Sequence, residues 1–161
     1  MDTKKLQDKF MKGTVPISLE GFYKGKLQTI INSNLKATLA KFIFSFWLPW
    51  YGKWFDTNQN RGDNIVSTYL IPLLKFRLKE NFRVKKEFGG VHVFSFKTSV
   101  QKSLKDNIKV LQLNYDLPQN PPNIRQVIDE IAEVDKNVYL GKAHIKEGRL
   151  FRTIAFFTLW K

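Results

Sequence analysis

The stretch VYLGKAHIKEGRLFRTIAFFTLW, residues 138–160, decides the fold. Residues 138–145 and 150–160 predict two strands, and residues 146–149 predict the turn that joins them. The chain therefore ends in a strand of a hairpin. A helix-grip fold usually ends in a long helix, so this ending argues against that fold.

Further segments upstream predict strands that are joined by short loops. Gly89 and Gly90 predict a turn into the strand at 91–99, which is a hairpin signal. The polar stretch NQNRGDN, 58–64, predicts a loop. The other expected strands lie at 18–26, at 51–57, elsewhere within 65–100, and at 108–115. Short antiparallel connections and an abundance of aromatic residues favour a closed or nearly closed barrel, which removes sheet edges. We therefore expect one mainly β domain over residues 1–161.

Three segments predict helices. Leu6 and Phe10, spaced i,i+4 among charged residues, predict a short N-terminal helix. Residues 35–48 are apolar nearly all round, which favours a helix buried between the barrel and another element. A lid over a pocket, or an element that touches a membrane through interfacial Trp, is the alternative for this segment.

The third expected helix spans residues 121–134. Pro121 suits a first helical position, where its missing N–H costs nothing. The apolar residues that follow are spaced for one helix face: Ile124, Val127, Ile128, Ile131 and Val134. The acidic residues Asp129, Glu130 and Glu133 then predict a solvent-facing side.

Two regions of the chain carry a resemblance to a known family. The stretch PWYGKWFD (49–56), preceded by Gly21-Phe22-Tyr23-Lys24-Gly25, and the run from Ile128 to Lys142 resemble the GXWXG-type proteins of uncharacterised function. Tyr23 stands where this family's pattern has Trp. The resemblance implies a lipocalin-like barrel of unassigned activity, and barrels of this class can hold one small apolar ligand.

The charge is strongly positive and unevenly distributed. The net charge of +13 divides into +5 for residues 1–56, +7 for residues 57–110 and +1 for residues 111–161. A cationic surface attracts phosphate, in nucleic acid or in lipid headgroups, although it also serves simple solubility. The basic residues that would form such a surface are Lys75, Arg77, Lys79, Arg83, Lys85 and Lys86. Phe76 and Leu78 alternate with them, so a solvated strand face is the simpler interpretation.

No reaction signature is present. Without Cys, disulfides, thiolate catalysis and Cys-based metal sites are excluded. His92 and His144 lie in expected strands, and no zinc-binding spacing, nucleophile elbow or nucleotide-binding loop occurs. Asp56 follows Trp54 and Phe55, where burial could raise its pKa for acid–base work, but capping of a turn is the more common role. We therefore expect no metal and no cofactor.

These patterns favour a barrel that binds a small hydrophobic, lipid-like ligand. The expected lining residues are Tyr23, Trp50, Trp54, Asp56, Tyr115 and His144. The alternatives are a cationic binder of nucleic acid or anionic lipid, and an enzyme on the same scaffold that uses Asp56 or His144. No signal peptide or transmembrane stretch is visible, so a cytoplasmic location is expected. The sequence leaves the oligomeric state open.

Overall fold

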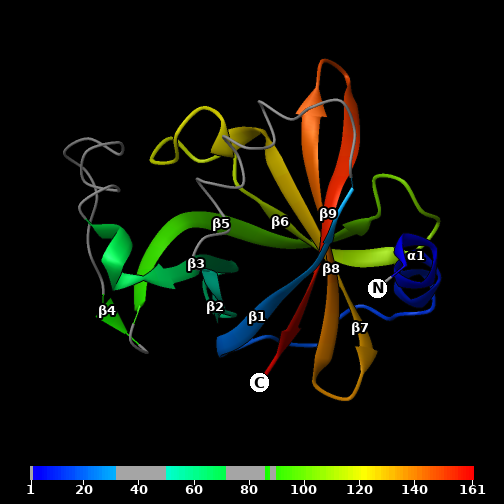
Figure 1. The fold of residues 1–161 in the computed structure, drawn as a ribbon, viewed down its shortest axis with the longest axis horizontal. Helices are drawn as coiled ribbons and strands as arrows, with labels where there is room; N and C mark the ends of the chain where they lie inside the picture. Colours follow the sequence, from blue (N-terminus) through cyan, green and yellow to red (C-terminus); the bar gives the residue numbers. More distant parts are fainter. Residues whose placement is uncertain (1, 32–49, 72–85, 88–89) are drawn as a thin grey trace.

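A computed structural model describes residues 2–31, 50–71, 86–87 and 90–161 of the chain (Figure 1). The expected apolar helix at 35–48 lies outside the described residues, as do Lys75, Arg77, Lys79, Arg83 and Lys85. The expected N-terminal helix is confirmed as α1 (Thr3–Met11). The Asp2 carboxylate caps it by accepting a hydrogen bond of 3.1 Å from the Lys4 amide.

The described strands close into an antiparallel barrel of eight, as the sequence predicts. Around the ring the order is β3-β2-β1-β9-β8-β7-β6-β5, and β5 pairs with β3 to complete it. A further strand, β4 (Lys86–Glu87), pairs with the start of β5. The bounds of the barrel strands are β1 (Gly21–Ile30), β2 (Trp50–Asp56), β3 (Arg61–Ser67), β5 (Gly90–Lys102), β6 (Lys109–Asn114), β7 (Val127–Asp135), β8 (Val138–Glu147) and β9 (Leu150–Trp160).

The predicted helix at 121–134 is wrong, because most of this segment forms β7. Only a short 3-10 turn, η3 (Ile124–Gln126), precedes the strand, and a second such turn, η1 (Thr68–Leu70), follows β3. The Val and Ile residues whose spacing suggested a helix face are β-branched and pack well on a pleated sheet. In β7, Val127 and Ile131 belong to the barrel interior, whereas Ala132 packs beneath α1. The acidic residues Asp129 and Glu130 therefore point to opposite faces of the sheet.

The predicted loop at 58–64 is half right. The turn ends at Asn60, which adopts a left-handed φ of 47°, and β3 begins at Arg61. Gly62 pairs with Phe55 of β2 and with Phe96 of β5, so the RGD tripeptide lies within the barrel wall. Polar composition suggested a loop here, but pairing on both sides satisfies the backbone of this polar strand.

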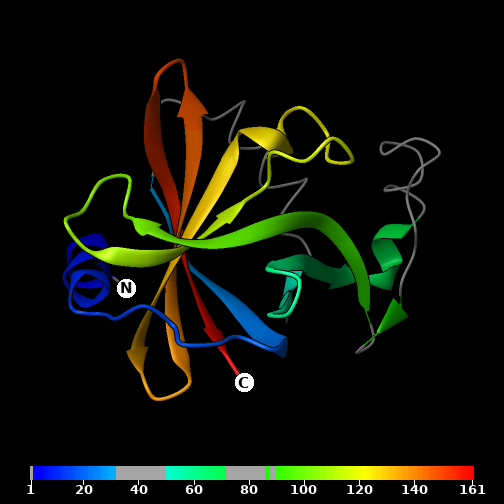
Figure 2. The ribbon, with the colours of Figure 1, turned by 180° about the vertical axis from the view of Figure 1, so that it is seen from behind.

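Among the described residues, two apolar clusters hold the fold together, one inside the barrel and one outside it. The interior cluster draws on all eight barrel strands and includes Tyr23, Phe55, Phe96, Tyr115 and Phe157. The outer cluster lies where α1 packs on β6, β7, β8 and β9, and consists of Leu6, Phe10, Val110, Ala132, Leu140 and Phe156. Figure 2 shows the chain that follows α1 running along the barrel to the start of β1.

This connecting segment (residues 14–20) is fixed at both ends. Thr14 pairs with Glu133 at the end of β7. At its other end, Leu19 is buried in the interior cluster, and its carbonyl accepts a hydrogen bond of 2.6 Å from the Thr57 hydroxyl. The segment therefore connects α1 to the barrel and contributes an apolar side chain to the interior.

Candidate functional site

A polar network lies inside the barrel, centred on Lys53 of β2. The Lys53 ammonium is 2.8 Å from the Asp129 carboxylate, 2.8 Å from the Asn64 carbonyl oxygen and 2.5 Å from the Tyr115 hydroxyl. The side chains of Lys53 and Asp129 are only 1% and 2% exposed. An ion pair is thus sealed within an apolar interior.

The neighbours of Lys53 complete this interior network. The Tyr115 hydroxyl donates to Asp129 Oδ2 at 2.9 Å and accepts from the Asn64 amide at 3.1 Å. The same Asn64 amide donates to the Phe94 carbonyl at 3.2 Å, and the Trp50 indole N–H donates to Asn64 Oδ1 at 3.2 Å. We call the set Lys53, Asn64, Tyr115 and Asp129 the interior network.

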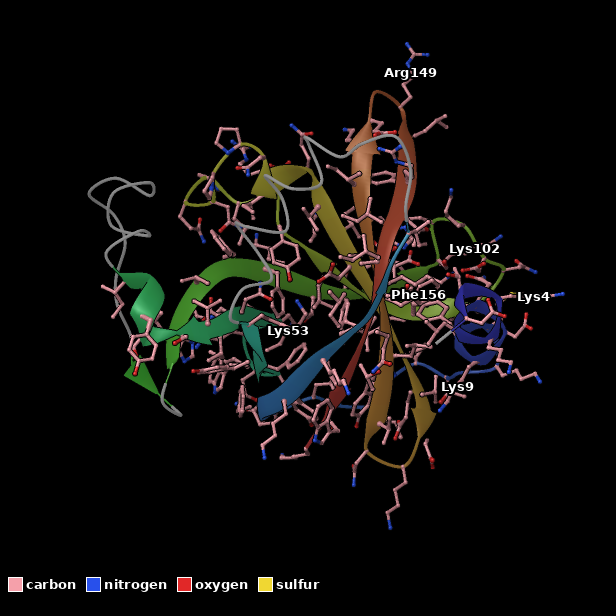
Figure 3. The ribbon with its side chains drawn as sticks, in the orientation of Figure 1. Lys4, Lys9, Lys53, Lys102, Arg149 and Phe156 are labelled. Atoms are coloured by element: carbon pink, nitrogen blue, oxygen red, sulfur yellow. The ribbon has the colours of Figure 1, made fainter. Side chains whose placement is uncertain are left out.

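Aromatic rings surround the Lys53 ammonium. Its nitrogen lies 5.2 to 5.6 Å from four ring centroids, those of Trp50, Phe96, Tyr115 and Phe157. At this separation the negative face of a ring attracts a cation. In Figure 3, Lys53 lies at the barrel, well away from α1, whereas Phe156 lies close to that helix. The rings therefore form an aromatic cage around the ion pair.

The strand register brings the interior network together. Lys53 and Asn64 are cross-strand partners in β2 and β3, and Asn64 is in turn paired with Val93 of β5. Asp129 of β7 is paired with Leu113 of β6, two residues before Tyr115. Phe94 adopts a left-handed φ of 50°, which breaks the alternation of β5. Side chains from four parts of the barrel therefore meet at one point.

Burial shifts the ionisation of this network. Removal from water lowers the pKa of the Lys53 ammonium, and the charge of Asp129 opposes that shift. Burial also raises the pKa of the Tyr115 hydroxyl well above its usual value, and the nearby Asp129 carboxylate adds to the increase. A buried ion pair of this kind is rarely the most stabilising solution for a core, since desolvation offsets much of the Coulomb attraction.

Three of the six expected lining residues meet in this interior. Tyr115 is a member of the interior network, and the Trp50 indole N–H donates to Asn64 of that network. Tyr23 packs edge-on against Phe55 and Tyr139, with ring centroids 5.6 and 5.5 Å away. Burial, reinforced by Glu133 and Tyr23, raises the pKa of Tyr139 to about 12.

The other three expected residues lie away from the network. Trp54 packs edge-on against His92, whose ring nitrogen is 3.0 Å from Asp63. Asp56 ends β2, accepts a hydrogen bond of 3.0 Å from the Gln59 amide and lies 3.9 Å from Arg61. This is the turn-capping role that the sequence analysis considered more common for Asp56.

His144 belongs to a second polar group on the outer face of β7 and β8. Its ring is fully buried, with Nε2 3.2 Å from Glu130 and Nδ1 within hydrogen-bond distance of the Thr153 hydroxyl, at 3.1 Å. Glu130 also accepts from the Ser103 hydroxyl at 2.7 Å and from the Leu104 amide at 2.6 Å. Burial acts to raise the pKa of Glu130, but His144 and these hydrogen bonds outweigh it, and the pKa is lowered.

Lys142 and Asp106 extend this second group toward α1. They form an ion pair, and the Lys142 nitrogen lies 4.3 Å from the Phe10 ring centroid. The Gln7 amide of α1 donates to Asp106 at 2.7 Å. We call the set Ser103, Asp106, Glu130, Lys142 and His144 the outer network.

A small cleft is found near the connecting segment. Its volume is about 140 Å³, close to that of an engineered cavity that binds benzene. Asp56 and Val100 line it, together with three residues that also belong to or pack on the interior cluster: Leu19, Phe55 and Leu111. From Phe55, edge-on ring contacts continue to Phe96 at 5.5 Å and from Phe96 to Tyr115 at 5.3 Å. A chain of rings therefore links the cleft to the interior network.

Sequence reasoning missed Lys53, Asn64 and Asp129. Asn64 fell in the predicted loop, and Asp129 fell on the solvent side of the predicted helix. The available signal was the alternation in WYGKWFD (50–56), which puts Lys53 on the same face as Phe55. That pattern indicates a lysine on the apolar face of a strand, but the partner that makes its burial tolerable lies 76 residues away in sequence.

No protein-family model matches the chain, and no curated protein matches its sequence. A solved structure of a protein from Thermomonospora curvata is similar in fold, with a TM-score of 0.56 and 13% sequence identity. The match covers 100% of this chain and 88% of that chain. At this identity the likeness supports the barrel fold alone. In the part of the chain that the structure describes, no helix is long and apolar enough to cross a membrane.

Proposed function

We propose that the barrel binds a small apolar molecule, with the interior network as its polar anchor. The observation that carries this proposal is the Lys53–Asp129 ion pair, buried in a cage of four rings. Replacement of a buried ion pair by apolar residues of similar volume is often neutral or stabilising, so stability alone does not account for the pair. A few convergent polar groups within an apolar, aromatic interior are typical of a ligand-binding site.

The fold and the resemblance to the GXWXG-type proteins support the same proposal. Closed barrels of eight strands are wide enough to hold one small ligand in their interior. The cleft beside the connecting segment is the approach for such a molecule, because Phe55 and Leu111 of the interior cluster form part of its lining. Entry beyond Phe55 requires the rings between the cleft and Lys53 to rotate.

Extraction of the purified full chain tests the proposal. Organic extraction followed by mass spectrometry is expected to release a small apolar molecule in a stoichiometric amount. Titration of the extracted protein with the neutral dye Nile red is expected to saturate, since an apolar probe gains by leaving water. Recovery of no molecule together with no saturable Nile red binding would sink the proposal.

A variant of the cleft sharpens this test. Val100 lines the cleft and is 55% exposed, so Val100→Trp fills the cleft without disturbing the core. We expect Nile red to bind this variant roughly tenfold more weakly, a loss of about 1.4 kcal/mol. Leu150→Trp is the matched control, because Leu150 is 76% exposed and begins β9, outside the cleft lining. Equal affinities of the two variants would argue against the cleft as the approach.

A further inference from the structure

The interior network uses nearly all of its hydrogen-bonding capacity. A lysine ammonium has three donors and no acceptor. Those of Lys53 match three acceptors, on Asn64, Tyr115 and Asp129. The amide of Asn64 donates to the Phe94 carbonyl and to Tyr115, and the Tyr115 hydroxyl donates to Asp129. No donor of these side chains is therefore left over for a ligand.

One acceptor in the network is left open. Asp129 Oδ2 accepts from both Lys53 and Tyr115, whereas Asp129 Oδ1 has no hydrogen-bond partner among the described residues. The Asp129 side chain is 2% exposed, so this oxygen is buried. A buried acceptor without a partner costs about 1–3 kcal/mol. A bound molecule that supplies a donor to this oxygen recovers that cost.

From this count we infer that the bound molecule is neutral and carries a hydroxyl or N–H donor, and that Asp129 Oδ1 accepts the hydrogen bond. The inference rests on the proposed function and adds the chemical class of the ligand. A carboxylate ligand fits poorly, because it brings only acceptors and meets the like charge of Asp129. A carbonyl or ether ligand likewise supplies no donor.

The surroundings of the Lys53 ammonium, the partner of Asp129, indicate the rest of the molecule. The ring centroids of Trp50, Phe96 and Phe157 lie 5.6, 5.3 and 5.2 Å from its nitrogen, and its positive charge is already neutralised by Asp129. A second charge in this cage would be buried without a partner, which is costly. The structure therefore favours an apolar alcohol or phenol over a fatty acid.

A set of matched probes tests this inference on the extracted wild-type chain. Dodecanol, its methyl ether and sodium dodecanoate share one alkyl chain and differ in the polar end. We expect dodecanol to bind roughly 10- to 100-fold more tightly than either of the others by displacement of Nile red, in line with the strength of a hydrogen bond to a charged group. Equal or tighter binding of the ether or the carboxylate would overturn the donor requirement and leave the proposed function standing.

A substitution at the open oxygen provides the second arm. Asp129→Asn keeps the shape of the side chain but has a single acceptor oxygen, which Lys53 and Tyr115 occupy, and places an N–H donor where Oδ1 was. The preference for dodecanol over its ether is therefore expected to fall to roughly one or below. Glu130→Gln is the matched control, since Glu130 is the next residue of β7 and belongs to the outer network. A retained preference in Asp129→Asn would contradict the inference.

If this variant does not fold, the ratio of dodecanol to ether affinity measured on the wild-type chain still tests the inference. Saturable Nile red binding without displacement by any of the three probes would overturn the inference but not the proposed function.

Discussion

The interior network and the outer network contain neighbouring residues of β7, Asp129 and Glu130. They differ in whether every oxygen of that carboxylate has a hydrogen-bond partner. Asp129 points into the barrel, and its Oδ1 has no partner among the described residues. Glu130 points outward, and both of its oxygens accept hydrogen bonds, from Ser103, Leu104 and His144 among others. Both groups are sealed from water, so exposure does not separate them.

The difference indicates separate roles for the two networks. In the outer network Glu130 and Lys142 each have a partner, His144 and Asp106 respectively, and Phe10 and Gln7 of α1 complete its cover. Such a closed arrangement ties α1 to the barrel. The interior network holds an ion pair in an aromatic cage and keeps one acceptor open, which is the arrangement expected of a ligand anchor.

The largest expected effect follows from removing one member of the interior ion pair. Asp129→Ala leaves Lys53 buried without a counter-charge, and we expect the free energy of unfolding to fall by about 3–5 kcal/mol. The measurement is urea unfolding followed by circular dichroism.

Removal of both charges at once separates the cost of an unpaired buried charge from the contribution of the ion pair itself. The double variant Lys53→Met, Asp129→Leu is expected to recover stability to within about 1 kcal/mol of wild type, because apolar residues of similar volume often replace a buried ion pair without loss. It is also expected to lose dodecanol binding. A double variant as unstable as Asp129→Ala would show instead that the interior network serves stability.

A substitution in the outer network is expected to lower stability and to leave dodecanol binding unchanged. Glu130→Gln weakens charge-assisted hydrogen bonds with His144, Ser103 and the Leu104 amide, so the free energy of unfolding should fall by about 1–3 kcal/mol. Dodecanol affinity should be unchanged, because the side chain lies outside the barrel. Weaker dodecanol binding in this variant would erase the functional distinction between the networks.

A smaller effect concerns acid stability. The pKa of Glu130 in the folded chain lies below its ordinary value of 4.5, so its contribution to stability is complete above that pH. The contribution is lost as the pH falls through the folded pKa. Glu130→Gln should therefore show a shallower decrease in stability than wild type when urea unfolding is compared at neutral pH and at about pH 3. Parallel curves for the two proteins would show that Glu130 does not carry this dependence.

The smallest effect is expected at an exposed ion pair. Arg125 and Asp116 lie 2.7 Å apart, but their side chains are 44% and 57% exposed. Arg125→Ala should change the free energy of unfolding by no more than about 0.2–1 kcal/mol, because water screens such pairs. This variant sets the baseline against which losses in either buried network are judged. A loss as large as that of Glu130→Gln would remove the contrast between surface and buried charge.

Strand β7 and the hairpin that follows it show how much of the fold could be predicted from the sequence. The alternation of 138–160, the short connections and the aromatic content predicted an antiparallel barrel, and the i,i+4 pair Leu6–Phe10 predicted α1. The alternation around His144 also placed it on one face with Leu140 and Lys142, as the structure has it. In β7, however, apolar spacing fits a helix and a strand equally well over a few turns, and pairing with both β6 and β8 decided for the strand.

The sequence by itself determined the local patterns: the strands of the final hairpin, the aromatic side chains for an interior, the N-terminal helix and the positive charge. These depend on residue type and spacing over a few positions, which a sequence states directly. Only the tertiary structure decided that Lys53, Asn64, Tyr115 and Asp129 meet, since that depends on which strands pair and in which register. A one-residue shift of any of these strands would turn its member of the network to the other face of the barrel.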